Sequence, residues 1–444
     1  MKKRIEMKVV NPHAAGIDIG SRSHFVAVGQ DISQIKEFGV SHSSHVEIVQ
    51  YLKSHKINTV AMESTGSYWQ GIYLVLVEEG FDVLLVPGAQ IKSFRKTDIK
   101  DARHIQQLHT LGLLSSCFLP DQFTGILREL SRHRKSLIQD SSRYINRIQK
   151  CLRLMNFRLD VVVSDIVGVS GRKIINAILG GERDTNKLAL LADKRVKKST
   201  AEISDALHGN YIPHLLFEMQ NCLEMYEMCL SQIQKTEEQI GIELYRAPKQ
   251  SMKEEQIEFA KKQLKGKNQP RINLQSLSYK IYGVDLSAIP CVSSGTLLTI
   301  ISELGSSIEK FTNSKGFTSW LRLAPNNKIS GGKVLSSSTP RGKNPLSIAL
   351  RDVANVIGLQ KNTNHLTETF RRIGLKKGRC AAITAVARKL AVIIYNMIKY
   401  KKPFSPEVPS HIKERIEYRK KKYAMSILKE YNITAIDSEG VVLS

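Results

Sequence analysis

The chain has 444 residues, of which 66 are Lys or Arg and 41 are Asp or Glu, so its formal charge at pH 7 is +25. Hydrophobic residues make up 42% of the sequence, which is enough for folded cores and excludes a disordered protein. The length predicts two or three domains. The charge indicates a partner such as nucleic acid, an anionic membrane surface or the ribosome, with a merely basic soluble enzyme as the alternative.

No signal peptide or membrane span is expected, because the basic N-terminus lacks an apolar core of the required length. The most apolar segment, "AVARKLAVIIYNMIKY", is interrupted by Arg388 and Lys389 and is typical of a buried helix. The six cysteines form no C-x-x-C pair, which argues against structural zinc and a disulfide framework. We therefore expect a cytoplasmic protein with no membrane partner.

Residues 13 to 114 alternate between strand and helix patterns. Apolar strand patterns occur at 13–20, 23–29, 35–42, 58–64 and 81–87. Helix patterns occur at 45–55, 67–80 and 98–114. The resulting order of three strands, helix, strand, helix, strand and helix predicts an α/β domain with a mixed sheet.

The middle of the chain is predicted to be helical. Residues 121–156 form one long basic helix with an apolar stripe, and shorter helices follow over 160–212. From Leu216 to Leu244, apolar residues recur in steps of three and four, broken only at Glu237. That spacing predicts a coiled coil, which either pairs between subunits or folds back on the preceding long helix.

Four acids stand at the ends of these predicted elements. Asp18 lies within the first strand and Glu63 ends the fourth, while Asp98 and Asp101 open the helix after the last strand. An acid among apolar neighbours in a strand is costly unless it is paired or bound to metal. Because strand ends and helix starts converge at one edge of an α/β sheet, we expect these four carboxylates to meet.

Four clustered carboxylates need cations, and hard oxygen ligands favour Mg²⁺ or Mn²⁺. Two such ions would clamp both sides of a phosphodiester under attack. Basic residues surround the last two acids and would hold the flanking phosphates: Lys92, Arg95, Lys96, Lys100 and Arg103. The alternative is structural, with Asp98 capping its helix, Asp101 interacting with the helix dipole, and Asp18 bonded to backbone amides.

Three segments that carry these acids, "GIDIGSRSHFVAV", "AMESTGSYWQGIYLVLVEEGFDVLLVP" and "KTDIKDARHIQQL", resemble a known family. They look like the DEDD insertion-sequence transposases, the RNA-guided bridge-RNA recombinases, which are related to pilin-gene invertases. The resemblance implies a ribonuclease H-like, resolvase-like first domain whose metal-binding acids are Asp18, Glu63, Asp98 and Asp101. It also implies DNA element ends and target as substrates, a guide RNA, and a nucleoid-associated, prokaryotic protein.

The C-terminal segments "IPCVSSGTLLTIISELGSSIEKF" and "SWLRLAPNNKISGGK" are similar to the family's second domain. There, a serine just before paired glycines is the nucleophile, and here only Ser330 fits. From the residues alone, a serine beside two glycines leaves room for a phosphate, although "SGGK" is more typical of a flexible loop. Four nearby cations are expected to contact nucleic acid: Lys328, Lys333, Arg341 and Lys343.

The sequence departs from the family pattern in two places. Cys291 and Ser294 stand where glycines are usual, and Pro340 and Arg341 fall within a stretch that commonly reads Ser-Lys-x-Gly-Asn. These changes leave Ser330 in place but alter its surroundings.

We predict five parts. The first is a ribonuclease H-like catalytic domain at 1–120, and the second is a long-helix and coiled-coil region at 121–246. A charged linker or insertion follows at 247–280, then a mostly α-helical serine-bearing domain at 281–405 and a basic tail at 406–444. The predicted function is a site-specific DNA recombinase that moves its own element as a homodimer or homotetramer. The alternatives are a metal-dependent junction-resolving nuclease without a covalent intermediate, an actin-like kinase, and an RNA-binding scaffold.

Overall fold

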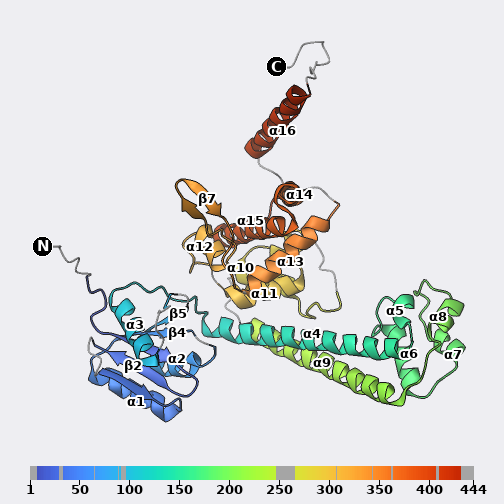
Figure 1. The fold of residues 1–444 in the computed structure, drawn as a ribbon, viewed down its shortest axis with the longest axis horizontal. Helices are drawn as coiled ribbons and strands as arrows, with labels where there is room; N and C mark the ends of the chain where they lie inside the picture. The colour runs from blue at the N-terminus through green and yellow to red at the C-terminus, as the bar shows by residue number, and fades with distance from the viewer. Residues whose placement is uncertain are drawn as a thin grey trace. The chain divides into compact units, whose positions relative to one another are not determined.

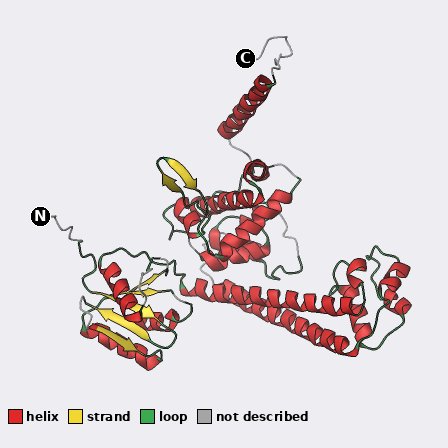
Figure 2. Ribbon diagram, in the orientation of Figure 1, coloured by secondary structure: helices red, strands yellow, loops and turns green. Residues whose placement is uncertain are grey.

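The computed structural model describes residues 8–431 except 30–33, 65, 89, 92–96, 247–265, 307, 343, 362–363 and 407–409. The chain divides after Leu119 into two compact units (Figure 1). The first is a mixed α/β unit and the second is almost entirely helical (Figure 2). The finer division into five parts stays a prediction, and the charged segment at 247–265 lies outside the described residues.

The first unit has the element order that the sequence predicted. In chain order it contains β1 (Ala14–Ile19), β2 (His24–Val28), β3 (Ile35–Phe38), α1 (His42–Ser54), β4 (Thr59–Glu63), α2 (Trp69–Glu78), β5 (Asp82–Val86) and α3 (Asp98–Thr110). The strands form one sheet in the order β3-β2-β1-β4-β5. The β1–β2 and β2–β3 pairs are antiparallel, whereas β1–β4 and β4–β5 are parallel.

Alternating residues of the central strands face two different layers, as the two-residue period of a strand requires. Ala15, Ile17 and Ile19 of β1 belong to a large apolar core with residues of α1 and α2. Ala61 of β4 belongs instead to a smaller cluster with Ile105 of α3. The even-numbered residues of β1 therefore face α3, and the sheet has a helix layer on each side.

The second unit begins with two long antiparallel helices, α4 (Gln122–Leu154) and α9 (Pro213–Arg246), which lie side by side (Figure 1). Most of the predicted apolar stripe of α9 is buried within the chain, including Met219, Leu223 and Ile240. The structure therefore describes the fold-back alternative. Pairing of this helical hairpin between subunits, and its classification as a coiled coil, stay predictions.

Glu237, which interrupts the apolar stripe, forms a buried ion pair with α4. Its Oε1 accepts a hydrogen bond from Arg134 Nε at 2.8 Å, and each side chain is only 7% exposed. Glu237 Oε2 accepts from the backbone N–H of Arg271 at 3.0 Å, and Arg134 also donates to the Asn268 carbonyl at 2.8 Å. The ion pair at the break thus links α4 and α9 to the segment that contains Asn268 and Arg271.

Four short helices connect the far ends of α4 and α9. They are α5 (Leu159–Val162), α6 (Val169–Leu179), α7 (Thr185–Leu190) and α8 (Thr200–Ala206). Their apolar side chains share one core with the ends of the long helices, including Phe157, Ile174 and Leu207, all fully buried. The helical hairpin therefore ends in a packed cluster with its own core.

The rest of the second unit is a helical body with one two-stranded ribbon (Figure 2). Its elements are α10 (Leu274–Tyr282), the 3₁₀ helix η2 (Leu286–Ala288), α11 (Ser294–Leu304), α12 (Ser314–Trp320), β6 (Lys328–Ser330), β7 (Lys333–Ser336), α13 (Pro345–Leu359), α14 (His365–Lys377) and α15 (Arg379–Tyr400), and the chain continues into helix α16 (Ser410–Glu430). Glu303 of α11 accepts two hydrogen bonds from the Arg132 guanidinium, both 3.0 Å long, which joins this body to α4.

Helix α15 is the helix among the described residues that is long and apolar enough to cross a membrane. Half of its apolar window is buried, and it packs against α12, α13 and α14. Ala387, Leu390 and Ile394 are fully buried there. Its apolar character is thus that of a core helix, as the sequence predicted.

Candidate active site

Helix α3 lies unusually close to β1 because Gly16 has no side chain. A Cβ atom placed on Gly16 would lie 2.3 Å from the backbone nitrogen of Gln106 and 2.5 Å from the carbonyl oxygen of Ala102. The Gln106 side chain, which is buried, donates to the Ala14 carbonyl at 3.4 Å and to Thr110 Oγ1 at 3.0 Å. These contacts fix the helix over the face of β1 that carries Asp18.

The four predicted acids come from β1, β4 and α3. Asp18 follows Gly16 by two residues and faces α3, and Glu63 is the last residue of the parallel neighbour β4. Asp98 and Asp101 are the first and fourth residues of α3. The strand-edge argument therefore placed all four on elements that adjoin one another.

The pKa of Asp18 reflects the proximity of the other three acids. Partial burial raises this pKa to about 6, and the charges of Asp101, Asp98 and Glu63 contribute in that order. Three other carboxylates therefore act on one carboxyl group. Within the described residues, however, no three Asp, Glu, His or Cys side chains are close enough to hold one ion. The acids share an electrostatic field, but their oxygens do not converge on a point.

Two local features suit a cation. Oδ1 of Asp101 is buried and has no hydrogen-bond partner within the described residues, so it retains an unused acceptor. Gly88, just after β5, leaves room for the Glu63 carboxylate, since a Cβ there would lie 2.3 Å from Glu63 Oε1. An all-oxygen donor set with an uncompensated negative charge matches the preference of Mg²⁺ and Mn²⁺.

Asp98 does not cap its helix, so that structural alternative is wrong. The cap is Thr97, whose Oγ1 accepts a hydrogen bond from the Lys100 backbone N–H at 3.4 Å. Asp98 is exposed and Asp101 half-buried, one turn apart in the first turn of α3. The threonine cap leaves the Asp98 side chain available for another role.

The predicted basic rim is only partly described. Lys92, Arg95 and Lys96 lie outside the described residues. Lys100 is exposed on α3, and Arg103 is half-buried on the same helix. The described part of the rim therefore places positive charge on the helix that carries two of the acids.

Ser330 lies in the second unit, at the end of β6. From the residues alone "SGGK" was more typical of a flexible loop, which is wrong: residues 328–336 form an antiparallel ribbon in which Ser330 pairs with Lys333. Gly331 and Gly332 make the two-residue turn with φ values of +53° and +74°, as in the type I′ turns typical of hairpins. Ser330 is exposed beside this turn.

The four cations predicted around Ser330 are placed as follows. Lys328 and Lys333 are exposed on the two strands of the ribbon. Arg341 is exposed beyond it, and its carbonyl accepts a hydrogen bond from Arg322. Lys343 lies outside the described residues.

Cys291 and Ser294, at the turn before α11, differ in backbone conformation. Cys291 has φ of +64°, in the left-handed region that favours glycine. Ser294, by contrast, is a buried first residue of α11, which Ser293 caps by accepting from Thr296 N–H at 3.3 Å. Cys291 thus adopts a backbone conformation that a glycine would adopt without strain.

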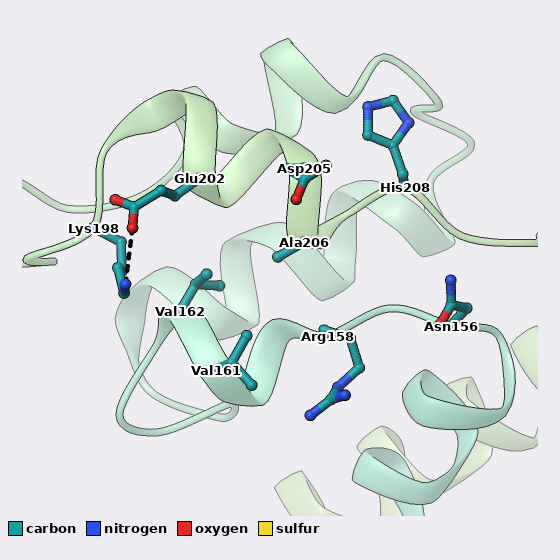
Figure 3. Close-up of a pocket in the computed structure, with 9 residues that line it drawn as sticks. All are labelled: Asn156, Arg158, Val161, Val162, Lys198, Glu202, Asp205, Ala206 and His208. Atoms are coloured by element: carbon teal, nitrogen blue, oxygen red, sulfur yellow. Dashed lines mark hydrogen bonds and ion pairs between the residues drawn. The ribbon is translucent and has the colours of Figure 1, made fainter.

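A pocket in the helical cluster at the end of α4 and α9 has a different character (Figure 3). Its volume is about 420 Å³, and its lining combines apolar with charged side chains of both signs: Asn156, Arg158, Val161, Val162, Lys198, Glu202, Asp205, Ala206 and His208. Glu202 is already paired there, accepting from Lys198 at 2.8 Å. Unlike the acids of the first unit, this lining balances its own charge.

Residues 15–157 match the DEDD transposase model of the IS110 type, and residues 285–370 match the model of the transposase IS116/IS110/IS902 family. The chain belongs to the IS110 family of transposases. No curated protein matches it. The first match contains all four acids of this IS110-type enzyme, and the second contains Ser330. The protein is therefore an enzyme that acts on DNA in transposition, and DEDD transposases typically use a divalent metal.

Proposed function

We propose that this transposase is a site-specific DNA recombinase that mobilises an insertion sequence by covalent serine chemistry. The main observation in its favour concerns Asp18, whose pKa is raised by burial and by the negative charges of Asp101, Asp98 and Glu63. Such coupling is typical of catalytic carboxylates. We propose a ribonuclease H-like fold for the first unit, consistent with its mixed sheet order.

The four acids would hold Mg²⁺ or Mn²⁺, and bound ions would neutralise charge on the attacked phosphate and its leaving oxygen. The chain's own residues bind and position the DNA. Lys100 and Arg103 face phosphates near the acids, and Lys328 and Lys333 do so near Ser330. Together with the formal charge of +25, these side chains favour the binding of a polyanion such as DNA.

In the cleavage step, Ser330 Oγ forms a bond to the scissile phosphorus while the bond from phosphorus to one DNA oxygen breaks. The serine proton passes to a base, and the departing DNA oxygen takes up a proton and leaves as a hydroxyl. Rejoining reverses these events when a DNA hydroxyl attacks the phosphoserine. The phosphodiester energy is retained throughout, so no external energy source is needed.

Target choice would be delegated to an element-encoded RNA, in line with the family resemblance and the basic surface. Bringing two DNA molecules together would require a dimer or tetramer, for which the α4–α9 hairpin offers a long surface. The enzyme would act in the cytoplasm of a prokaryotic cell, on the nucleoid.

A covalent-adduct assay tests the proposal. The protein with its co-purifying RNA is incubated with Mg²⁺ and DNA spanning the element ends, then resolved on a denaturing gel. A DNA-linked protein band is expected, and it should disappear in Ser330→Ala and in Asp98→Ala. Ser336→Ala, on the other strand of the same ribbon, is the matched control and should keep the band.

Cleaved DNA without an adduct, unaffected by Ser330→Ala, would contradict serine chemistry. That result would leave the four acids as a metal-dependent nuclease that uses water.

A further inference from the structure

The ribbon that carries Ser330 has two chemically different faces. Cross-strand partners lie on the same face of a ribbon, and consecutive residues lie on opposite faces. Since Ser330 pairs with Lys333, these two share one face, which Lys328 also joins by its spacing of two. Ile329 pairs with Val334, so these two occupy the other face.

The second face exposes a large apolar area. Ile329 is 63% exposed and Val334 is 59% exposed, although both side chains are apolar. A two-stranded ribbon is marginally stable in water, and clustered exposed apolar side chains mark a contact surface. This apolar face, defined by Ile329 and Val334, is therefore a candidate contact surface for a partner.

Charge decides which partner fits. Residues 326–344 contain four cations, Lys328, Lys333, Arg341 and Lys343, and no Asp or Glu. Every described residue from Lys328 to Leu335 is exposed, so the ribbon projects from the helical body (Figure 1). A cationic projection with an apolar side suits DNA, where phosphates and base faces lie within a few ångströms of each other.

We propose that this ribbon is a strand-separating wedge that enters the DNA at the cleavage site. The face with Lys328, Ser330 and Lys333 holds the phosphate of the strand to be cut. The apolar face packs against the bases that are unstacked there, as apolar side chains do when they are inserted between base steps. The proposal rests on Ser330 as the nucleophile and adds a role for the opposite side of the same strands.

The two faces make this assignment geometrically consistent. A ribbon lying between parted strands presents one face to each, so nucleophilic and apolar side chains can act at once. The Gly331–Gly332 turn has open space around it, with no atom within 4 Å of a Cβ added at either glycine. The tip, which carries no side chain at either glycine, is therefore unobstructed and can lead the insertion.

The test uses DNA spanning the element end, with 2-aminopurine beside the cleavage site, and full-length protein with its co-purifying RNA. The Ser330→Ala background blocks chemistry, so fluorescence reports unstacking alone. We expect a several-fold rise on binding, and loss of most of that rise in Ile329→Thr with Val334→Thr. Threonine keeps the strand preference and the shape of valine. Val356→Thr on α13, where Val356 is 49% exposed, is the matched control and should retain the rise.

A second measurement restores Ser330 and compares paired with pre-mismatched DNA. The threonine double variant should cut paired DNA poorly and recover on DNA that is already unpaired at the site. Equal unstacking by the double variant would overturn the proposal. So would a change in oligomeric state by light scattering, which would show that another copy of the chain covers the face. If serine chemistry is wrong, the protein with Ser330 restored forms no DNA adduct, but the unstacking signal persists, so the two failures are distinguishable.

Discussion

The acids and the serine are held in opposite ways. The acids lie on strands and a helix whose neighbours are buried, with α3 fixed against β1 over a glycine. Ser330 lies on a short exposed ribbon whose turn has free space around it. The acids are positioned by the fold itself, whereas Ser330 is exposed to whatever molecule the ribbon contacts. In the proposed mechanism, this division would let the correct DNA complex position the serine.

Replacing Gly16 with Ala should destabilise the first unit, where the acids are held by close packing. The added Cβ would meet backbone atoms at 2.3 and 2.5 Å, which cannot move without displacing α3. We expect a loss of about 3 kcal/mol in unfolding free energy and a fall in Tm of roughly 10 °C or more for the first unit. Gly331→Ala is the matched contrast. Alanine at this positive φ should destabilise the ribbon alone, by about 1 kcal/mol. Equal melting curves for Gly16→Ala and the wild type would disprove the close contact.

Replacing Gly88 with Ala should separate stability from chemistry. The new Cβ would meet only the end of the Glu63 side chain, with Oε1 at 2.3 Å, so the carboxylate can swing away at little structural cost. We expect adduct formation to fall about 100-fold, because a displacement near 1 Å at a catalytic group has that order of effect. Thermal melting and single-turnover adduct assays measure the two quantities. Gly125→Ala, in open space on α4, should leave adduct formation unchanged and should not lower the melting temperature, since alanine favours helix more than glycine does. Unimpaired chemistry in Gly88→Ala would argue against Glu63 as a catalytic ligand.

Asp18→Asn should show, through stability alone, that the neighbouring acids repel the charge of Asp18. The raised pKa means that folded Asp18 holds its proton up to about pH 6, so its ionisation destabilises the metal-free wild type as pH rises from about 4 to 6. Since Asp18 is only partly buried, we expect the variant to exceed the wild type by about 1 kcal/mol above pH 6, and by nearly nothing at pH 4. Urea unfolding across this range measures the difference.

His24 supplies an internal control for that experiment. Burial lowers its pKa to about 4, so its contribution to stability increases with pH over about pH 4 to 6.5, opposite to that of Asp18. Both proteins carry His24, and its effect cancels in their difference. Added Mg²⁺ should stabilise the wild type more than Asp18→Asn, and an equal effect on both would contradict a metal site that includes Asp18.

The sequence predicted the sheet because its strands have strong apolar patterns and distinct turns. The same patterns placed Asp18, Glu63, Asp98 and Asp101 at one edge, since strand ends converge there. It could not predict that Gly16 and Gly88 are needed for this arrangement, because close approach is a tertiary contact. A glycine inside an apolar strand, as in "GIDIG", was the available signal.

The sequence did not predict the ribbon or the ion pair of Glu237, for two different reasons. "ISGGKV" contains the Gly-Gly signal of a two-residue hairpin, but its strands are only three and four residues long and polar neighbours hide them. The partner of Glu237 is Arg134, 103 positions earlier in the chain. Only the antiparallel packing of α4 and α9 brings the two together, so no local pattern could explain the acid.

The helical hairpin also sets a length. At 1.5 Å per residue, the 34 residues of α9 extend for about 50 Å. That distance corresponds to roughly 15 base pairs at 3.4 Å each. The buried pair of Arg134 and Glu237 keeps the two helices in register, so this span is a fixed dimension of the enzyme. The α4–α9 hairpin is thus a structural element of fixed length within the second unit.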